Sequence, residues 1–321
     1  MNYLIPALPL ITGFVLDAVF GDPYTIPHPV RLMGKLIAFL EKYIRKYFQN
    51  LRLGGAVLAM IVILCSAGIP AVLLYFCYQI NIIFGILTES IFCYYMLAAR
   101  CLCDESMKVY RAFQNHDTES ARKSVSMIVG RDTAVLDVAG IIRATVETIA
   151  ENTSDGVTAP LFWMALGGAV GGCFYKAVNT MDSMLGYQNE TYINIGRFPA
   201  KFDDVLNYIP SRFTALLMIA VCPLLKLDSK NAFHIWKRDR RKHASPNSAQ
   251  TESVCAGALH VRLAGDAYYF GELHHKEYIG EDDRPVENED IRRTNQLMYL
   301  TALLMLIIAV IIRILIFRRL V

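Results

Sequence analysis

Long apolar stretches alternate with strongly polar ones along this chain of 321 residues. A helix needs about 20 apolar residues to span a membrane, because it crosses about 30 Å of hydrocarbon at about 1.5 Å per residue. Four stretches meet this requirement and are predicted to span: residues 3–20, 54–76, 79–98 and 294–312. Gly68 and Pro70 offer a break in the long apolar run that contains the middle two. Residues 156–175 and 212–226 fit a span, a re-entrant segment or a buried helix equally well.

Composition supports this interpretation, since 54% of the residues are hydrophobic and only 19% are charged. The sequence therefore predicts an all-α, polytopic integral membrane protein with roughly four to six membrane helices and helical segments that face the cytosol. We expect a single domain over residues 1–321, because the polar blocks are interleaved with the spans. The net charge of +3 does not indicate a nucleic-acid partner, and the eight scattered cysteines are interpreted as small core residues.

Basic residues gather in 31–52, 100–143 and 226–242, which are therefore predicted to be cytoplasmic. The apolar N-terminal stretch lacks a basic leader and a small-residue cleavage site, so it is expected to be a retained anchor. The basic run Lys237–Lys242 is interpreted as a positive-inside anchor, and the acids from Glu281 to Asp290 as a solvated loop. The protein is thus placed in the cell (inner) membrane as a multi-pass protein with its active site facing the cytoplasm.

Two polar blocks lie in the first half of the chain. Three prolines stiffen residues 21–35 (GDPYTIPHPVRLMGK) and hold Asp22, His28 and Arg31 near the membrane surface; the alternative is a rigid turn with interfacial anchors. Farther on, Arg143, Glu147 and Glu151 fall on one helical face, because they are spaced four residues apart. Asn152 and Asp155 follow, directly before an uncharged glycine-rich stretch where unpaired charge is costly.

Two further blocks combine cations, carboxylates and amides. Residues 175–187 place Lys176, Asn179 and Ser183 on one helical face with Asp182 beside them, and residues 201–212 pair Lys201 with Asp204 and Asp203 with Asn207, ahead of Arg212. Such oxygen ligands suit Mg²⁺, and such cations suit phosphate. The alternative is interfacial polar residues and an ion-paired surface helix.

A fifth block, residues 243–265, begins with the turn signal Ser-Pro-Asn-Ser. It contains Ser245 and Asn247, and Glu252 is expected to begin a helix of small residues. A polar turn that leads into a helix is a weak signal of an anion site.

Taken together and in order, these stretches resemble the CbiB/CobD family of cobalamin biosynthesis. The matching segments are GDP…PHPVR, GRDT (130–133), ETIAENTSDGVTAPLFW (147–163), YKAVNTMDSMLGY, AKFDDVLNYIPSR and SPNS…E…AGAL, between about residue 11 and residue 300. The resemblance implies an adenosylcobinamide-phosphate synthase. This membrane ligase would join adenosylcobyric acid to (R)-1-amino-2-propanol O-2-phosphate, or a related amino-alcohol phosphate, through an amide bond. ATP and Mg²⁺ are the implied cofactors. The lipid bilayer and other corrinoid-pathway enzymes are the implied partners.

The characteristic positions of the family are assigned roles here as a hypothesis. The candidate catalytic residues are Glu151, Asp155, Lys176, Asp182, Lys201, Asp203 and Asp204. Mg²⁺ ligands, and a base for the incoming ammonium group, are expected among Glu151, Asp155, Asp182, Asp203 and Asp204. The candidate substrate-binding residues are His28, Arg31, Arg131, Glu147, Asn152, Asn179, Asn207, Arg212, Ser245, Asn247 and Glu252.

The chain departs from the family at Ala249, His260 and Ala264, where glycine is common. An added Cβ disfavours a positive φ, so a close backbone–phosphate contact at 245–252 is in doubt. Two other functions remain open: a transporter, because broken helices and intramembrane charges also mark substrate pathways, and a membrane scaffold for corrinoid enzymes.

Overall fold

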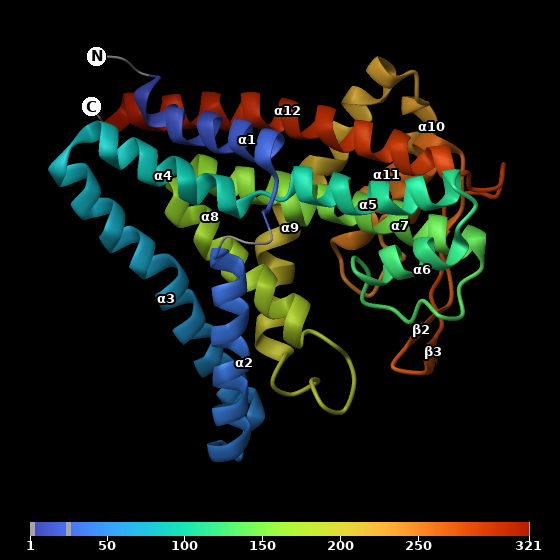
Figure 1. Ribbon diagram of the computed structural model, residues 1–321, viewed down its shortest axis with the longest axis horizontal. Helices are drawn as coiled ribbons and strands as arrows, with labels where there is room; N and C mark the ends of the chain where they lie inside the picture. The colour runs from blue at the N-terminus through green and yellow to red at the C-terminus, as the bar shows by residue number, and fades with distance from the viewer. Residues whose placement is uncertain (1–3, 24–26, 321) are drawn as a thin grey trace. The chain divides into compact units, whose positions relative to one another are not determined.

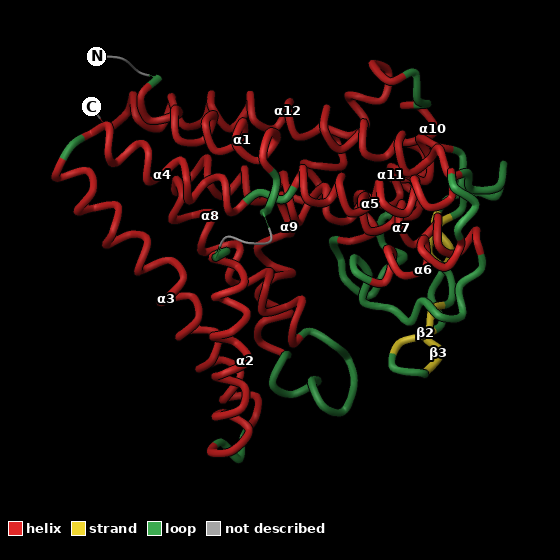
Figure 2. Tube along the Cα trace, viewed as in Figure 1, coloured by secondary structure: helices red, strands yellow, loops and turns green. Residues whose placement is uncertain are grey.

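The computed structural model describes residues 4–23 and 27–320, and most of them are helical (Figures 1 and 2). Residue 3 of the first predicted span and residues 24–26 of the proline-rich segment lie outside the described residues. The chain divides into two compact units, each assembled from segments that are far apart in the sequence. Unit 1 contains 1–98, 159–207 and 306–321, and unit 2 contains 99–158 and 208–305.

The regular elements of unit 1 in its described part are all helices. Its elements are η1 (Ile5–Ala7), α1 (Leu8–Phe20), α2 (Pro29–Tyr47), α3 (Leu51–Ile80), α4 (Ile82–Met96), α8 (Ala159–Leu185), the first part of α9 (Arg197–Val221) and the last part of α12 (Asn288–Leu320). Helix α4 packs against both α1 and α3. Gly13 permits the first contact, because a Cβ there would lie 2.6 Å from the Cβ of Cys93.

Unit 2 adds short strands to its helices. Its elements are α5 (Ala99–Gln114), α6 (Thr118–Ser126), α7 (Val138–Asn152), the π-helical turn η2 (Thr153–Thr158), the remainder of α9, η3 (Cys222–Leu225), α10 (Ser229–Asp239), α11 (Ser248–Leu259), β1 (Leu263–Ala264), β2 (Ala267–Tyr269), β3 (Glu272–His274), β4 (Tyr278–Ile279) and the first part of α12. β1 pairs antiparallel with β4, and β2 with β3. Every residue of α11 is buried, and Gly257 allows α10 to approach it closely.

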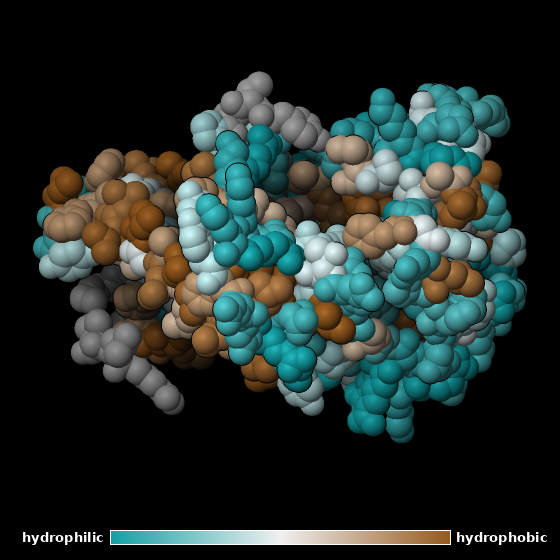
Figure 3. Space-filling view, turned by 90° about the horizontal axis from the view of Figure 1, so that it is seen from below, coloured by the Kyte–Doolittle hydropathy of each residue, from teal (hydrophilic) through white to brown (hydrophobic). Residues whose placement is uncertain are grey.

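Among the described residues, five helices are long and apolar enough to cross a membrane: Leu51–Ile80, Ile82–Gln114, Val138–Leu185, Arg197–Leu225 and Asn288–Arg318. The prediction of an all-α polytopic membrane protein is confirmed. Both ambiguous stretches lie almost entirely within helices of this length, whereas Ile5–Phe20 is a shorter apolar helix. Large apolar side chains are exposed along α3 and α4, in the brown area on the side of the α3–α4 turn in Figure 3.

The expected break at Gly68 and Pro70 is wrong, because α3 continues through both residues to Ile80. A proline is tolerated inside a membrane helix when other groups satisfy the carbonyl that it leaves free. The chain turns instead at Asn81, whose extended backbone ends α3. The Asn81 side chain accepts a hydrogen bond of 2.7 Å from the N–H of Ile83 and so caps α4.

The acids from Glu281 to Asp290 do not all form a solvated loop, because Asp290 is fully buried. Arg284 contacts Asp290 through both Nη atoms, and Arg293 donates to the same carboxylate at 2.8 Å. Asp239 of α10 is buried in a similar way between Arg238 and Lys242. Burial by itself would raise the pKa of Asp239, but its hydrogen bonds lower that pKa to about 2.

A buried ion pair joins segments of unit 1 that are far apart in the sequence. Arg313 Nη2 of α12 lies 3.6 Å from Glu89 Oε1 of α4. Tyr78 donates a hydrogen bond of 2.6 Å to Oε2 of the same carboxylate, and the N–H of Ala169 donates one of 3.2 Å to Oε1. Gly168 has a φ of 60°, and a Cβ at this position would collide with Glu89. The glycine therefore lets α8 approach the carboxylate.

Replacing Arg313 with leucine should destabilise the protein by about 3–5 kcal/mol, because it leaves the Glu89 carboxylate buried without its cation. The free energy of unfolding in detergent measures this loss. The double variant Arg313→Leu/Glu89→Gln should recover most of it, since a neutral amide needs no cation. Arg318→Leu, at an exposed position of the same helix, is the matched control. Equal losses in the single and double variants would contradict this role of the pair.

Candidate functional site

Three glutamates from two helices of unit 2 face one another. Glu147 and Glu151 lie one turn apart on α7, which begins where the Asp137 side chain accepts a hydrogen bond of 2.7 Å from the N–H of Gly140. Helix α11 begins at Ser248, four residues earlier than expected, and Ser248 Oγ donates a hydrogen bond of 2.8 Å to Glu151. Glu252 is one turn farther along α11, so it faces the same side of α7.

Glu147 is held from two sides. Arg131 forms a short ion pair with its Oε2, and the N–H of Ala264 donates a hydrogen bond of 2.7 Å to its Oε1. Glu147 thus pairs with Arg131, whereas Arg143 Nε has no hydrogen-bond partner among the described residues. Burial tends to lower the pKa of Arg131, but the charge and hydrogen bond of Glu147 outweigh it and raise that pKa. Arg131 is therefore a cation at neutral pH, held against the buried Glu147 side chain.

Two of the three departures from glycine lie at left-handed backbone positions. His260 has a φ of 56° and Ala264 a φ of 59°, a region that glycine occupies without strain. The chain nevertheless accepts these residues, and the Ala264 amide reaches Glu147 through that conformation. Ala249 lies inside α11, where a Cβ causes no conflict. The expected loss of a backbone contact at 245–252 is untested.

Glu252 differs from the other two glutamates, since its Oε2 is buried without a hydrogen-bond partner among the described residues. Burial raises the pKa of Glu252 well above its ordinary value of 4.5, and the charges of Glu151 and Glu147 raise it further. Arg131 and Lys276 oppose this shift without cancelling it. Glu252 consequently holds a proton more firmly than an ordinary glutamate does.

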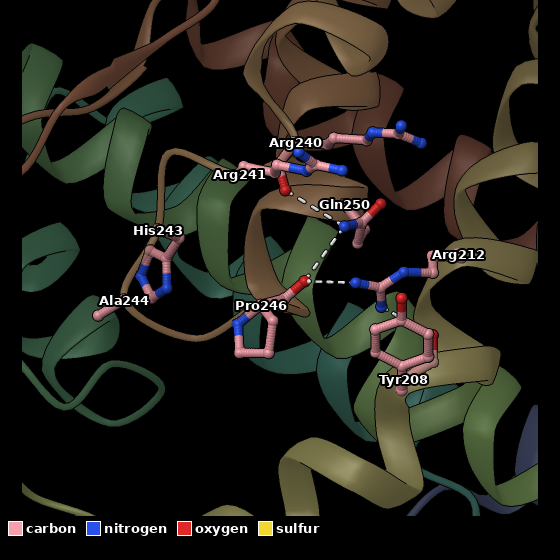
Figure 4. A pocket seen from close by; sticks show the side chains of 8 residues that line it. All are labelled: Tyr208, Arg212, Arg240, Arg241, His243, Ala244, Pro246 and Gln250. Carbon is pink, nitrogen blue, oxygen red and sulfur yellow. Dashed lines mark hydrogen bonds between the residues drawn. The ribbon is translucent and has the colours of Figure 1, made fainter.

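A cavity of about 530 Å³ in the same unit is lined by cationic side chains (Figure 4). Its lining residues are Tyr208, Arg212, Arg240, Arg241, His243, Ala244, Pro246 and Gln250. Arg212 is held in place, because it donates hydrogen bonds to the Tyr208 carbonyl at 2.7 Å and to Asn247 Oδ1 at 3.0 Å. Arg240 lies over the ring of Trp236. Two supported guanidinium groups, of Arg212 and Arg240, together with the exposed Arg241 form a site that suits a phosphate or another polyanion.

His243 connects the cavity with the glutamates. Its ring lines the cavity, and burial lowers its pKa, although the negative charge of Glu151 opposes that shift. The ring is therefore neutral at pH 7. Its Nδ1 accepts a hydrogen bond of 3.1 Å from the N–H of Ser245, which assigns the proton to Nε2. His243 thus lies between the positively charged cavity and the cluster of Glu147, Glu151 and Glu252.

A second set of predicted residues meets in unit 1, where α8 faces the start of α9. Asp203 accepts hydrogen bonds from Asn207 at 2.9 Å and from Asn179 at 3.4 Å. Tyr175 holds Asn207 through a bond of 2.9 Å. The predicted proximity of Asn179, Asp203 and Asn207 therefore appears in the structure, although their roles are untested. The same two helices carry four more of the predicted residues. Three of these side chains are half-buried, those of Lys176, Asp182 and Asp204, and that of Lys201 is exposed.

The remaining predicted residues are distributed as follows. His28 Nδ1 accepts a hydrogen bond of 3.2 Å from Val30 N–H and caps α2, and its Nε2 contacts Asp22. Arg31 is exposed on α2. The amide of Asn152 donates to the Thr148 carbonyl of its own helix, and Asp155 lies in the π-helical turn.

The predicted Mg²⁺ ligands are divided between the units, with Glu151 and Asp155 in unit 2 and Asp182, Asp203 and Asp204 in unit 1. In the described part of the chain, no three His, Cys, Asp or Glu side chains converge as a metal site. A Mg²⁺ ion that is also bound by the phosphates of a substrate needs only one or two carboxylates from the protein.

Four residues of the unit 2 site were not predicted as functional: Arg240, Arg241, His243 and Lys276. Arg240 and Arg241 belong to the basic run that was interpreted wholly as a membrane anchor. Arg238 and Lys242 of that run pair with Asp239, whereas Arg240 and Arg241 line the cavity. The available signal was their position directly before the Ser-Pro-Asn turn. Lys276 follows β3, and its place near Glu252 depends on tertiary structure alone.

The comparisons with known proteins agree on one family. Residues 10–298 match the model of the CobD/CbiB protein family. The chain is similar to the "Cobalamin biosynthesis protein CobD" of Clostridium perfringens, with 45% identity over 95% of this chain and 97% of the relative. It is 44% identical to the protein of that name from Pelobacter propionicus, over 94% and 93% of the two chains. It is 42% identical to the "Cobalamin biosynthesis protein CbiB" of Salmonella typhimurium, over 92% and 93%. No solved structure matches the chain.

The state of Glu252 should make stability depend on pH. The pKa of Glu252 is raised in the folded protein. Its contribution to the free energy of unfolding is therefore complete below pH 4.5 and is lost as the pH rises through the pKa of the folded state. Each unit of that difference corresponds to about 1.4 kcal/mol. Thermal unfolding in detergent from pH 5 to 8 should therefore show a steeper decline for the natural protein than for Glu252→Gln. Glu277→Gln, at an exposed glutamate, should leave the decline unchanged. Parallel curves for the natural protein and Glu252→Gln would contradict the raised pKa.

Proposed function

The chain belongs to the CobD/CbiB family, and on that premise we propose that it acts in cobalamin biosynthesis as an ATP-dependent amide ligase. The proposed reaction joins adenosylcobyric acid to (R)-1-amino-2-propanol O-2-phosphate, or to a related amino-alcohol phosphate, and yields adenosylcobinamide phosphate. The proposal places the reaction at the cytoplasmic face of the cell membrane, where the basic segments 31–52, 100–143 and 226–242 are predicted to lie.

The observation that carries the proposal is the meeting of the arginine cavity with the glutamate cluster at His243. An amino-alcohol phosphate has a dianionic phosphate at one end and an ammonium group a few bonds away. The cavity of Arg212, Arg240 and Arg241 suits the phosphate, and Glu147 and Glu151 suit the ammonium group. A nucleoside triphosphate carries no ammonium group of its own, so an arginine cavity next to glutamates fits the amino-alcohol phosphate better.

The reaction also requires a base, because an ammonium nitrogen has no lone pair with which to attack a carboxyl carbon. A carboxylate whose pKa is raised toward neutrality is an efficient acceptor for that proton. Glu252 is the best candidate, since it is buried beside the proposed ammonium site. In this proposal Glu252 acts in its ionised form and takes one ammonium proton. The freed nitrogen then attacks the acyl phosphate, the bond between the acyl carbon and the phosphate oxygen breaks, and phosphate leaves with the second nitrogen proton. The Nε2–H of His243 donates to a phosphate oxygen of the amino-alcohol phosphate.

The second set of polar residues is proposed to hold Mg·ATP. The carboxylate of Asp203 and the amide oxygens of Asn179 and Asn207 are oxygen ligands suited to Mg²⁺, and Lys176 and Lys201 suit its phosphates. Both Asp203 oxygens accept amide hydrogen bonds that hold the carboxylate in place, and a carboxylate beside two amide oxygens is a donor set that fits such an ion. ATP supplies the phosphoryl group that turns a corrinoid carboxylate into a competent acyl donor.

Replacing Arg240 or Arg241 with alanine should raise the KM for aminopropanol phosphate about 10- to 100-fold, the value of one charge-assisted hydrogen bond. The KM for ATP should not change. The assay contains purified protein in detergent, Mg·ATP, adenosylcobyric acid and aminopropanol phosphate, with mass spectrometry of the product. Lys237→Ala, in the same basic run but outside the cavity, is the control.

A higher KM for ATP in the arginine variants would assign the cavity to the nucleotide instead. If the folded natural protein binds corrinoid and forms no amide, the ligase proposal fails and the scaffold or transporter functions take its place.

Replacing Asp203 with asparagine should raise the Mg²⁺ concentration needed for half-maximal ligation by at least about 10-fold, because the charged oxygen ligand is lost. Tyr175→Phe is the matched control, since it removes only the hydroxyl that supports Asn207. The KM for aminopropanol phosphate should stay constant in both variants. An unchanged Mg²⁺ requirement in Asp203→Asn would exclude Asp203 as a ligand.

A further inference from the structure

Helix α2 of unit 1 has two exposed stripes that neither packing within the unit nor the proposed reaction explains. Its buried face consists of Met33, Ile37 and Ile44. On the opposite side runs a basic stripe of Arg31, Lys35, Lys42 and Lys46. Directly beside it runs an apolar stripe of Leu32, Phe39, Tyr43 and Tyr47. The three- and four-residue spacings keep each set on one side of the helix.

The apolar stripe is open along its whole length. Tyr47 is 65% exposed, and Leu32 and Phe39 are each 57% exposed. The rings lie against one another, with centroids 4.6 Å apart for Phe39–Tyr43 and 6.1 Å apart for Tyr43–Tyr47. A continuous exposed row of this kind is unfavourable in water and indicates a surface that another phase or molecule covers.

The lysines of the basic stripe have no ion-pair partner among the described residues. Among residues 4–23 and 27–320, no carboxylate lies within ion-pair distance of Lys35, Lys42 or Lys46. The acid of this helix, Glu41, is paired with Arg45 at 2.8 Å. Three lysines in a row therefore present uncompensated positive charge beside the aromatic rings, and their complement is a surface of negative charge.

The position of α2 indicates which surface this is. Only Phe48, Gln49 and Asn50 separate it from α3, which is long and apolar enough to cross a membrane. Gly54 of α3 fits closely against Ile44, so the end of α2 is held at the start of that helix. The apolar stripe thereby leads to Leu53, the first exposed apolar residue of α3. Within unit 1, α2 runs crosswise to α1 and α4 (Figure 1).

We propose that α2 lies in the membrane interface and binds anionic phospholipids. Leu32, Phe39, Tyr43 and Tyr47 enter the boundary between headgroups and acyl chains. The ammonium groups of Lys35, Lys42 and Lys46 contact lipid phosphates. This combination of an aromatic face with a lysine-rich face is typical of helices that lie in the plane of the bilayer surface. His28 and Pro29 begin the helix, so its orientation is set directly after the first apolar helix.

Tryptophan fluorescence of the full chain in lipid nanodiscs tests this proposal. Tyr43→Trp places a probe in the apolar stripe. Ala38→Trp places one at an exposed position of the same helix, on the far side of the basic stripe. The signal of the unsubstituted protein, which has two tryptophans, is subtracted. Tyr43→Trp should be quenched by lipids brominated about 5–10 Å below the headgroups, the depth of interfacial helices. Ala38→Trp should respond to aqueous acrylamide instead.

Lipid charge is tested by comparing phosphatidylglycerol with phosphatidylcholine nanodiscs. Quenching of Tyr43→Trp by brominated lipid should be at least about twofold stronger in phosphatidylglycerol. Lys35→Glu/Lys42→Glu/Lys46→Glu should abolish that difference. The control variant makes the same change in charge at three exposed lysines of unit 2: Lys123→Glu/Lys230→Glu/Lys237→Glu. This variant should keep the difference in quenching between the two lipids.

Three results would overturn the proposal. Equal responses of Tyr43→Trp and Ala38→Trp would show that the stripe does not enter the bilayer. Quenching that is independent of lipid charge would show that the lysines do not contact lipid phosphates. Protection of Tyr43→Trp from both quenchers would assign the stripe to a protein partner or a second copy of the chain.

Discussion

A charge inside an apolar chain must find a partner of opposite sign, and this requirement organises both units. An isolated buried ion costs far more than the few kilocalories per mole that stabilise a fold, so each one selects its partner from a distant segment. In unit 1, Glu89 brings α4, α8 and the end of α12 together through Arg313 and the amide of Ala169. In unit 2, Arg131 and the Ala264 amide of β1 meet at Glu147.

Glu252 departs from this pairing, and chemistry is proposed at this residue. It lies in α11, which is buried along its whole length, and its pKa is raised because Arg131 and Lys276 do not cancel the effects of burial and of the two neighbouring glutamates. Ser248 of the same helix donates to Glu151, and His243, in the loop before this helix, lines the cavity. A buried acid that can change its protonation state is expensive for stability and useful for proton transfer, which is a common compromise at active sites.

The two exposed stripes of α2 follow from the same physics on the outside of the molecule. An exposed row of aromatic rings is unfavourable in water, and neighbouring lysines repel one another. An anionic bilayer surface covers the rings and offsets the charge of the lysines. The proposed ligase needs a membrane anchor in any case. An interfacial helix would fix the depth of unit 1 relative to the lipid headgroups. Spanning helices alone fix that depth less precisely, because they can tilt or shift in the bilayer.

The sequence by itself determined the helical membrane class, because hydrocarbon thickness and the cost of unpaired backbone groups leave few alternatives for such long apolar stretches. It also indicated the family and most residues of both polar sets, since their motifs are local. His260 and Ala264, where the family commonly has glycine, both have a left-handed backbone. This too is a local property, because a positive φ favours glycine at that position.

Tertiary structure alone decided which charges meet. Arg131 rather than Arg143 pairs with Glu147, Arg240 and Arg241 leave the anchor run to line a cavity, and Lys276 reaches Glu252 from the end of a hairpin. Helical periodicity states which side chains share a face, but not which distant segment covers that face. That choice depends on packing and on the balance of buried charges across the whole unit.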